Sequence, residues 1–242
     1  MISEKLKEQL GDWTCLYPFF ESEEWTKLKE KIKPTLSETT PNIDVWFRAF
    51  KECPFSKVSV VWLGLSPYYN TDPYTKANVA DGLAFSTDQK HGVPASLFKL
   101  YKGLEWDMWG GMNLNMSRSN HLQFLANQGV LLLNTALTTT YGVPDTHLEA
   151  WKPFIAFVIK TLNEQKKGLI FCGFGSVANA MLTRVDRKVH SVYEREHPAA
   201  ASYTYRDWQH ENLFTKVNDE LSKRKQEIIL WDEHLVGMEV PF

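Results

Sequence analysis

The sequence predicts an α/β fold, a three-layer α/β/α sandwich around a central, mostly parallel four-stranded sheet. Four short apolar runs carry this prediction: VSVVWL (58–63), GVLLLN (129–134), GLIFCG (168–173) and the weaker KVHSVYE (188–194). Continuous apolar runs of this length are typical of parallel strands that are buried on both faces. Helix-length stretches separate the runs, and such alternation indicates a parallel sheet covered by helices.

Periodic apolar positions predict the helices of the two outer layers. Between the strands, helices fit residues 96–106, 121–128, 151–165 and 176–185. Residues 1–57 also favour helix, with Trp13, Trp25 and Trp46 as core anchors, and residues 206–226 favour a final helix. Because no repeat, low-complexity tract or clear linker interrupts the chain, we expect a single domain over residues 1–242.

The composition narrows the class of protein. With 43% hydrophobic and 23% charged residues, the chain resembles an ordinary globular protein. Its net charge of −2 means that a polyanion would have to be bound by a local patch and by backbone amides. The three cysteines form no CxxC pair, so we expect no metal site, and we expect no other cofactor. The absence of a signal-peptide pattern and of a long apolar run predicts a cytoplasmic protein that is not in a membrane.

Unusual residues follow all four predicted strands, in the segments GLSPYYN, NTALTTT, GFGS and EHPAAAS. In open α/β sheets, ligands bind beyond the carboxyl ends of the strands. These four segments therefore converge on one predicted site.

The same segments resemble family 1 uracil-DNA glycosylases. GLSPYY is similar to the family's water-activating loop GQDPYH, DGLAFS to HGLAFS, QGVLLLNTALT to QGVLLLN-x-x-LT, and HPAAAS to HPSPLS. The similarity covers roughly residues 45–232, in the right order. It implies the family's fold and a monofunctional DNA glycosylase that flips a pyrimidine out of DNA and hydrolyses its N-glycosidic bond, without a cofactor or an obligate protein partner.

The resemblance assigns roles to matching positions. Asn134 would read the pyrimidine edge, since an amide offers both a donor and an acceptor, and Phe85 would stack under the base. His197 would donate a hydrogen bond to O2 of the base as negative charge develops there. Tyr68 would close the pocket against substituents on C5. Ser176 and His147 resemble phosphate contacts of the family, although Ser176 equally fits an ordinary helix cap.

Some positions depart from the family pattern, and the first departure concerns the catalytic carboxylate. Ser66 stands where the family has its catalytic aspartate, and Leu65 replaces a glutamine. A serine can position water but carries no charge. The segment YNTDPYTKANVAD contains an insertion, and Asp72 or Asp81 in it could restore the charge. We favour Asp72 for its DPY context, the alternative being that it only starts a turn.

The second departure concerns the residue that fills the gap left by the flipped base. Ala201 replaces a leucine wedge, for which Tyr203 or Tyr205 could substitute. Changes around one pocket in an otherwise matching scaffold predict a changed substrate. We expect a modified pyrimidine, first of all plain or glucosylated 5-hydroxymethylcytosine in phage DNA, with antiviral defence as the setting. The alternatives are an ordinary uracil-DNA glycosylase in base-excision repair and a catalytically silent module that binds DNA or protein.

Overall fold

The computed structural model describes residues 2–72, 74–90, 92–200 and 207–237. Within them, a four-stranded parallel sheet has the strand order β3-β2-β5-β6. Its strands are β2 (Val60–Gly64), β3 (Val130–Asn134), β5 (Ile170–Phe174) and β6 (Ser191–Arg195). The predicted fold class is confirmed, and each strand lies within a few residues of its predicted range.

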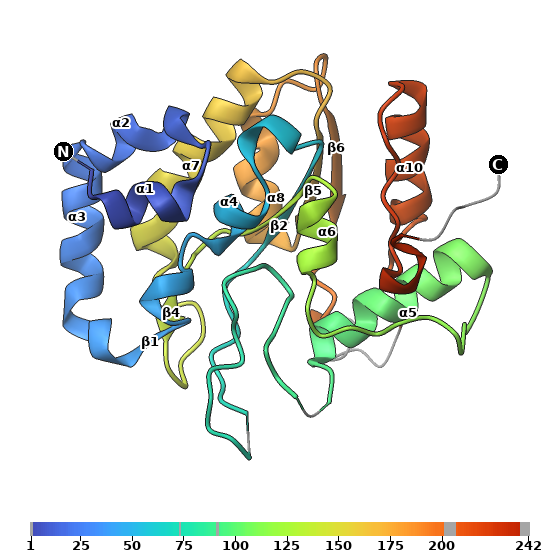
Figure 1. Ribbon diagram of the computed structural model, residues 1–242, viewed down its shortest axis with the longest axis horizontal. Coiled ribbons are helices and arrows are strands. Elements are labelled where there is room, and N and C mark those ends of the chain that lie inside the picture. Colours follow the sequence, from blue (N-terminus) through green and yellow to red (C-terminus); the bar gives the residue numbers. More distant parts are fainter. Residues whose placement is uncertain (1, 73, 91, 201–206, 238–242) are drawn as a thin grey trace.

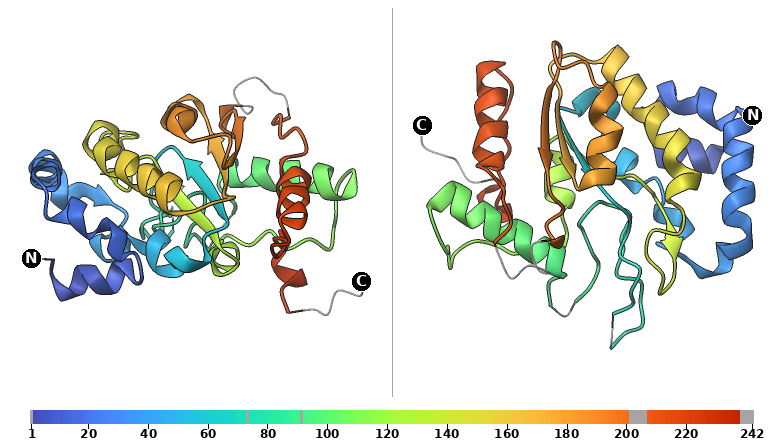
Figure 2. Two further views of the ribbon diagram at one scale, coloured as in Figure 1. Left: turned by 90° about the horizontal axis from the view of Figure 1, so that it is seen from above. Right: turned by 180° about the vertical axis from the view of Figure 1, so that it is seen from behind.

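Helices cover both faces of this sheet (Figure 1). Helices α7 and α8 lie on one side, whereas α5 and α10 lie on the other, as the two views of Figure 2 show. The helices after the first strand are α5 (Ala95–Trp109), α6 (Gln123–Asn127), α7 (Leu148–Gln165), α8 (Ser176–Met181) and α10 (Leu213–Lys223). Each matches a predicted helix, but α10 begins later than expected. No helix in the described ranges has the length and apolar character needed to cross a bilayer.

The N-terminal part forms an outer helical layer against α7 (Figure 1). It contains α1 (Glu4–Leu10), α2 (Tyr17–Phe20), α3 (Glu23–Ile32) and α4 (Arg48–Glu52). Short 3-10 helices lie at Thr14–Leu16, Lys33–Glu38, Ile43–Val45, Phe55–Lys57, Leu182–Arg184 and Glu233–Leu235. A small antiparallel pair, β1 (Thr39–Thr40) with β4 (Thr139–Thr140), was not predicted, because two residues are too short to show a pattern.

Aromatic side chains fill the interface between the N-terminal layer and α7. The ring of Phe154 is fully buried, and its centroid lies 5.1–5.9 Å from five other aromatic rings, those of Phe19, Phe20, Phe47, Phe50 and Trp151. Edge-to-face pairs of this kind add to the free energy gained from burial. The cluster therefore fixes the outer helical layer on α7.

On the opposite face of the sheet, Trp62 of β2 packs against the C-terminal part of the chain. Its ring stacks on Trp231 at 5.6 Å and meets the edge of Phe214 in α10 at 6.1 Å. Separate aromatic clusters therefore pack the helices onto the two faces of the sheet. Neither cluster covers the carboxyl ends of the strands, which remain available for a site.

Replacement of Phe154 by alanine is expected to lower the free energy of unfolding by about 3–5 kcal/mol, the usual cost of removing a buried phenylalanine. Urea unfolding followed by fluorescence measures this loss. Lys152→Ala, at an exposed position of the same helix, is the control and should change stability by only about 0.5 kcal/mol. Equal losses in the two variants would contradict the role of the cluster.

Candidate active site

A cavity of about 650 Å³ opens at the carboxyl ends of the strands, the edge of the sheet where the sequence predicts a ligand. Its wall includes six of the predicted residues: Leu65, Ser66, Tyr68, Phe85, Asn134 and His197. The segment between β2 and α5, which extends away from the sheet in Figure 1, forms one side of it. The volume is typical of a site for a small organic group.

Phe85 forms the aromatic wall of the cavity. Its ring lies 5.1 Å from Phe174 in an edge-to-face contact and 5.7 Å from the imidazole of His197. The backbone of Phe85 has a φ of +65°, a left-handed conformation that is unusual for a bulky residue. Such strain is found mainly where surrounding contacts impose it for function.

Asn134 ends β3 directly opposite Gly64, which ends β2. The Asn134 side chain is 8% exposed and lines the cavity, and among the described residues none shares a hydrogen bond with its amide. A Cβ atom at Gly64 would lie 2.5 Å from Asn134 Oδ1 and 3.5 Å from the Phe85 ring. Glycine is therefore required at position 64 for Asn134 and Phe85 to share one pocket.

His197 faces Phe85 from the segment after β6. The backbone N–H of Ala199 donates a hydrogen bond of 3.2 Å to His197 Nδ1, so the neutral ring carries its proton on Nε2. Burial lowers the pKa of His197, while the negative charge of Asp145 acts in the opposite direction. A neutral imidazole with an Nε2 proton is suited to donate a hydrogen bond to a carbonyl oxygen.

Tyr68 and Leu65 come from the turn after β2. The Tyr68 hydroxyl donates a hydrogen bond of 3.1 Å to the Phe85 carbonyl oxygen and lies 2.9 Å from Ser96 Oγ. Burial raises the pKa of Tyr68, so the phenol stays protonated. The carbonyl oxygen of Leu65 accepts hydrogen bonds from Thr135 Oγ1 and the Ala136 N–H, which tie this turn to the end of β3.

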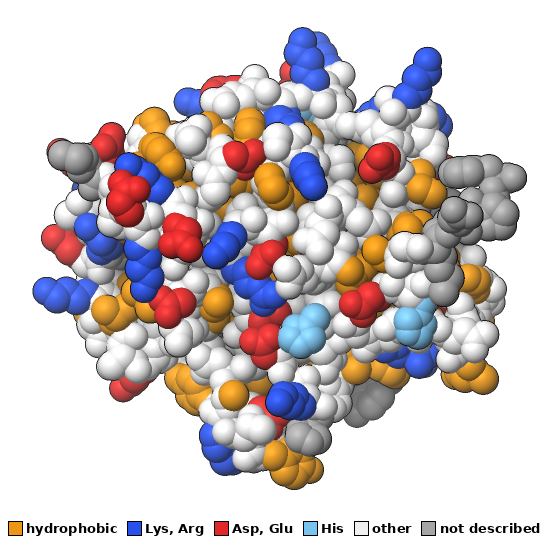
Figure 3. Space-filling model, viewed as in Figure 1, with side chains coloured by type: hydrophobic (Ala, Val, Ile, Leu, Met, Phe, Trp, Pro, Cys, Tyr) orange, Lys and Arg blue, Asp and Glu red, His pale blue; other side chains and the backbone are white. Residues whose placement is uncertain are grey.

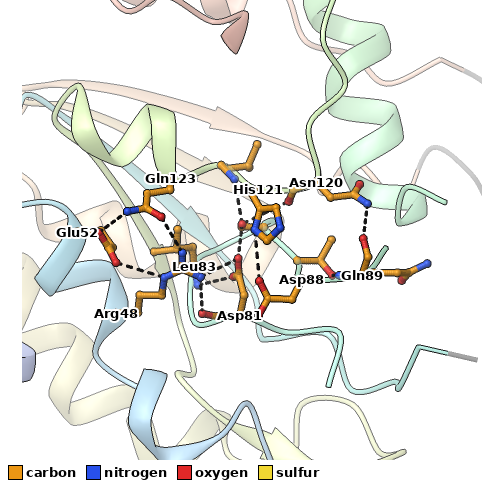
Figure 4. Close-up of polar contacts among 12 residues, drawn as sticks. Arg48, Glu52, Asp81, Leu83, Asp88, Gln89, Asn120, His121 and Gln123 are labelled. Atoms are coloured by element: carbon orange, nitrogen blue, oxygen red, sulfur yellow. Dashed lines mark hydrogen bonds and ion pairs between the residues drawn. The ribbon is translucent and has the colours of Figure 1, made fainter. Parts of the chain in front are cut away.

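Asp81 is buried and does not line the cavity, and Figure 4 shows its polar contacts. Its carboxylate lies 3.0 Å from Arg48 Nη1 and accepts hydrogen bonds from Ser86 Oγ at 2.5 Å and the Leu83 N–H at 3.0 Å. Burial nevertheless raises the pKa of Asp81. These bonds lie on either side of Phe85 in the sequence, so Asp81 supports the strained backbone at Phe85 instead of lining the cavity.

Asp81, Asp88 and His121 bring their ligand atoms within 4.8 Å of one another. The Asp81 carboxylate already contacts Arg48, whereas His121 Nδ1 lies 3.3 Å from Asp88 (Figure 4). These protein contacts account for the cluster without an ion.

Asp72 lies at the far end of the inserted segment. Its Oδ1 accepts hydrogen bonds from the backbone N–H groups of Tyr74 and Thr75, at 2.9 and 2.8 Å. This is the turn-forming alternative that the sequence left open.

Among the described residues that line the cavity, Asp145 is the only carboxylate, and it accepts a hydrogen bond from Ser66 Oγ. Asp145 was not predicted from the sequence, where its only signal is its place in the segment PDTH after the second strand of the sheet.

The predicted DNA contacts have different placements. Ser176 is exposed at the first position of α8, directly after Gly175, which packs against His197. His147 is 4% exposed, and its two ring nitrogens lie 2.9 Å from the hydroxyls of Thr35 and Thr138. Contrary to expectation, His147 therefore has no nitrogen left for a phosphate, and burial lowers its pKa. Ala201, Tyr203 and Tyr205 lie outside the described residues.

Charged side chains of both signs are mixed over the face shown in Figure 3. This distribution agrees with the net charge of −2 and shows no broad positive field in that view. An anionic ligand on this face would depend on local contacts.

The fold and the site define an α/β enzyme in which an amide, an aromatic ring and a neutral imidazole line one cavity at the carboxyl ends of the strands. A model of the uracil DNA glycosylase superfamily matches residues 50–222. A uracil-DNA glycosylase of Oceanobacillus iheyensis is 32% identical over 225 residues, covering 91% of this chain and 93% of that protein. One of Sulfurimonas denitrificans is 33% identical over 215 residues, covering 88% and 90%.

Solved structures agree with this assignment. The crystal structure of mimivirus uracil-DNA glycosylase matches with a TM-score of 0.84 and 25% identity, covering 94% of this chain and 89% of that one. The chain therefore belongs to the uracil-DNA glycosylase superfamily. It is a DNA glycosylase, which hydrolyses the N-glycosidic bond between a base and its deoxyribose.

Gly64→Ala is expected to displace the Asn134 amide and to slow base release by about 100-fold, because misplacing a binding group by about 1 Å has an effect of this size. Single-turnover assays measure the rate, and thermal unfolding checks that the fold persists. Gly111→Ala, at a position with open space around its Cβ, is the control. A Gly64→Ala enzyme with unchanged turnover would contradict the need for glycine there.

Asp145→Asn is expected to lower the pKa of His197 further, because it removes the negative charge that opposes the effect of burial. NMR titration of the imidazole nitrogens measures this pKa and also reports the Nε2-protonated tautomer. A pKa that rises or stays constant in the variant would contradict the effect of the Asp145 charge on His197.

Proposed function

We propose that this glycosylase excises a flipped-out pyrimidine that carries a substituent on C5, rather than plain uracil. Plain or glucosylated 5-hydroxymethylcytosine is the first candidate. The observation that carries the proposal is the extension of the cavity past Tyr68 into the inserted segment, whose residues Asn70, Thr71, Val79 and Ala80 line it. In the family a tyrosine closes the C5 side of the base. Here residues of the inserted segment line the cavity together with Tyr68, and we expect a C5 substituent to project towards them.

The lining of this extension suits a polar substituent. The Asn70 amide and the Thr71 hydroxyl offer hydrogen-bonding groups, while Val79 and Ala80 offer apolar contact. The segment is held in shape by backbone pairing between Thr71 and Asn78 and between Ala80 and Thr87. A preformed wall of this kind reduces the entropic cost of binding a bulky base.

The remaining cavity residues supply recognition and catalysis common to any pyrimidine. Asn134 pairs with the edge of the base, and Phe85 stacks on its face. As the N-glycosidic bond breaks, its electron pair moves onto the base, and the Nε2 proton of His197 stabilises the negative charge that develops on O2. Ser176, exposed at the start of α8 next to Gly175, is suited to contact a backbone phosphate.

A second candidate, excision of uracil in base-excision repair, is supported by the names of the related proteins, which are uracil-DNA glycosylases. If the substrate is instead a modified phage base, the setting that follows is antiviral defence in the cytoplasm of a bacterial host. The two candidates share the pocket. The bases differ in the C5 substituent and also at C4, where cytosine has an amino group and uracil a carbonyl oxygen.

Base release from matched DNA separates the candidates. We expect free base and alkali-sensitive sites from DNA that contains plain or glucosylated 5-hydroxymethylcytosine, and a rate at least about tenfold lower from uracil DNA, since a filled subsite adds about 1–3 kcal/mol. Chromatography of the released base and cleavage of end-labelled strands measure the two products. Unmodified DNA is the substrate control.

Two variants test whether release comes from this pocket. Asn134→Ala should abolish it, whereas Asn115→Ala, at an exposed position, should leave it unchanged. Release from uracil DNA alone would disprove the proposed modified base and would favour the second candidate.

A further inference from the structure

The turn after β2 places an uncharged residue, Ser66, in the wall of the cavity. Hydrolysis of an N-glycosidic bond generates positive charge on the deoxyribose and needs a group that accepts a proton from water. A serine hydroxyl provides neither charge nor sufficient basicity. The chain must therefore obtain a carboxylate from elsewhere, and Asp72 and Asp81 are both engaged away from the cavity wall.

Asp145 meets this requirement by its position. It is the only carboxylate among the described residues that line the cavity, and Ser66 Oγ donates a hydrogen bond to its Oδ1. The two residues are 79 positions apart, so the contact depends on the tertiary fold. Through this bond, the negative charge lies one hydroxyl group away from the position where the family has its aspartate.

The turn that carries Asp145 is fixed from both sides. Asp145 has a φ of +62°, a left-handed conformation that aspartate tolerates better than most residues. Its neighbour Thr146 lies 3.1 Å and 2.9 Å from the hydroxyls of Thr139 and Thr140 in β4. The Gly142 N–H donates a hydrogen bond of 2.9 Å to the Tyr69 carbonyl oxygen, which joins this turn to the one that contains Ser66. The contact between Ser66 and Asp145 is thus built into the fold.

We propose that Ser66 and Asp145 together replace the family's catalytic aspartate, with Asp145 providing the negative charge and Ser66 holding the water. The proposal rests on the glycosylase chemistry described above, but it does not depend on which base is excised.

The bond between C1′ and the base nitrogen breaks, and its electron pair leaves with the base. The oxygen of a water held by Ser66 forms a new bond to C1′. Asp145 stabilises the positive charge on the sugar until the new bond to C1′ removes that charge. As this bond forms, one proton of the water passes to Ser66 Oγ and the Ser66 proton passes to the Asp145 carboxylate, which later loses it to solvent. The released base takes up one proton from solvent, so water is the only co-reactant.

The first experiment measures single-turnover release from the best DNA substrate of the wild-type enzyme. Asp145→Asn should slow release by at least about 100-fold, the usual contribution of a general base. Asp219→Asn, at an exposed position of α10, is the matched control and should keep the wild-type rate. An Asp145→Asn enzyme with the wild-type rate would overturn the proposal.

The second experiment restores the charge on the other side of the hydrogen bond. Asp145→Ser should be as slow as Asp145→Asn, and adding Ser66→Asp to it should recover at least about tenfold of the rate, since the carboxylate returns to the same contact. If the role of Asp145 were only structural, its substitution would lower the stability of the protein, and thermal unfolding of each variant detects such a loss. A double variant no faster than Asp145→Ser, with both variants folded, would overturn the proposal.

The third experiment tests the role of Asp145 independently of which base the enzyme excises. Duplexes carrying a cationic pyrrolidine or a neutral tetrahydrofuran in place of one nucleoside mimic the sugar without any base. Asp145→Asn should weaken binding of the cationic duplex by at least about tenfold and leave binding of the neutral one unchanged, because transition-state analogues report charge stabilisation. Equal effects on both duplexes would overturn the proposal, even if no DNA base tested were released.

Discussion

The missing side chain of Gly64 is the constraint on which the pocket depends. Parallel pairing places Gly64 opposite Asn134 at the carboxyl ends of β2 and β3. The space that any Cβ atom would fill is occupied by the Asn134 amide and approached by the Phe85 ring. The positions of Asn134 and Phe85 are therefore coupled through one backbone position at the carboxyl end of β2, and the loops arrange the remaining cavity residues around it.

A buried ion pair supports this arrangement from behind. Phe85 adopts a left-handed backbone conformation, which has a cost in free energy that nearby contacts must offset. Asp81 contacts Arg48 and binds both Leu83 and Ser86, so it fixes the chain on either side of the strained residue. Asp81, which stands where the family has a histidine, thus supports the backbone around Phe85. Its carboxylate is paired with Arg48 and does not line the cavity.

The sequence predicted what depends on regular secondary structure. The four strands follow from apolar runs, and Asn134 and His197 meet because parallel strands end at one edge of the sheet. The position of Asp145 could not be predicted in this way. It follows β4, a strand of two residues without a pattern, and its partner Ser66 is 79 positions away. The burial of His147 between two threonines could not be predicted either, since neither Thr35 nor Thr138 adjoins it in sequence.

The inserted segment has a consequence for how this enzyme could diversify. Its tip is closed by local hydrogen bonds of Asp72, and only its two ends, near Asn70 and Ala80, contribute to the cavity. Mutations in these ends would reshape one wall while the sheet, the stacking ring and the imidazole stay in place. Selection for new bases could therefore act on a surface loop, where insertions are tolerated, and leave the bond-breaking machinery unchanged.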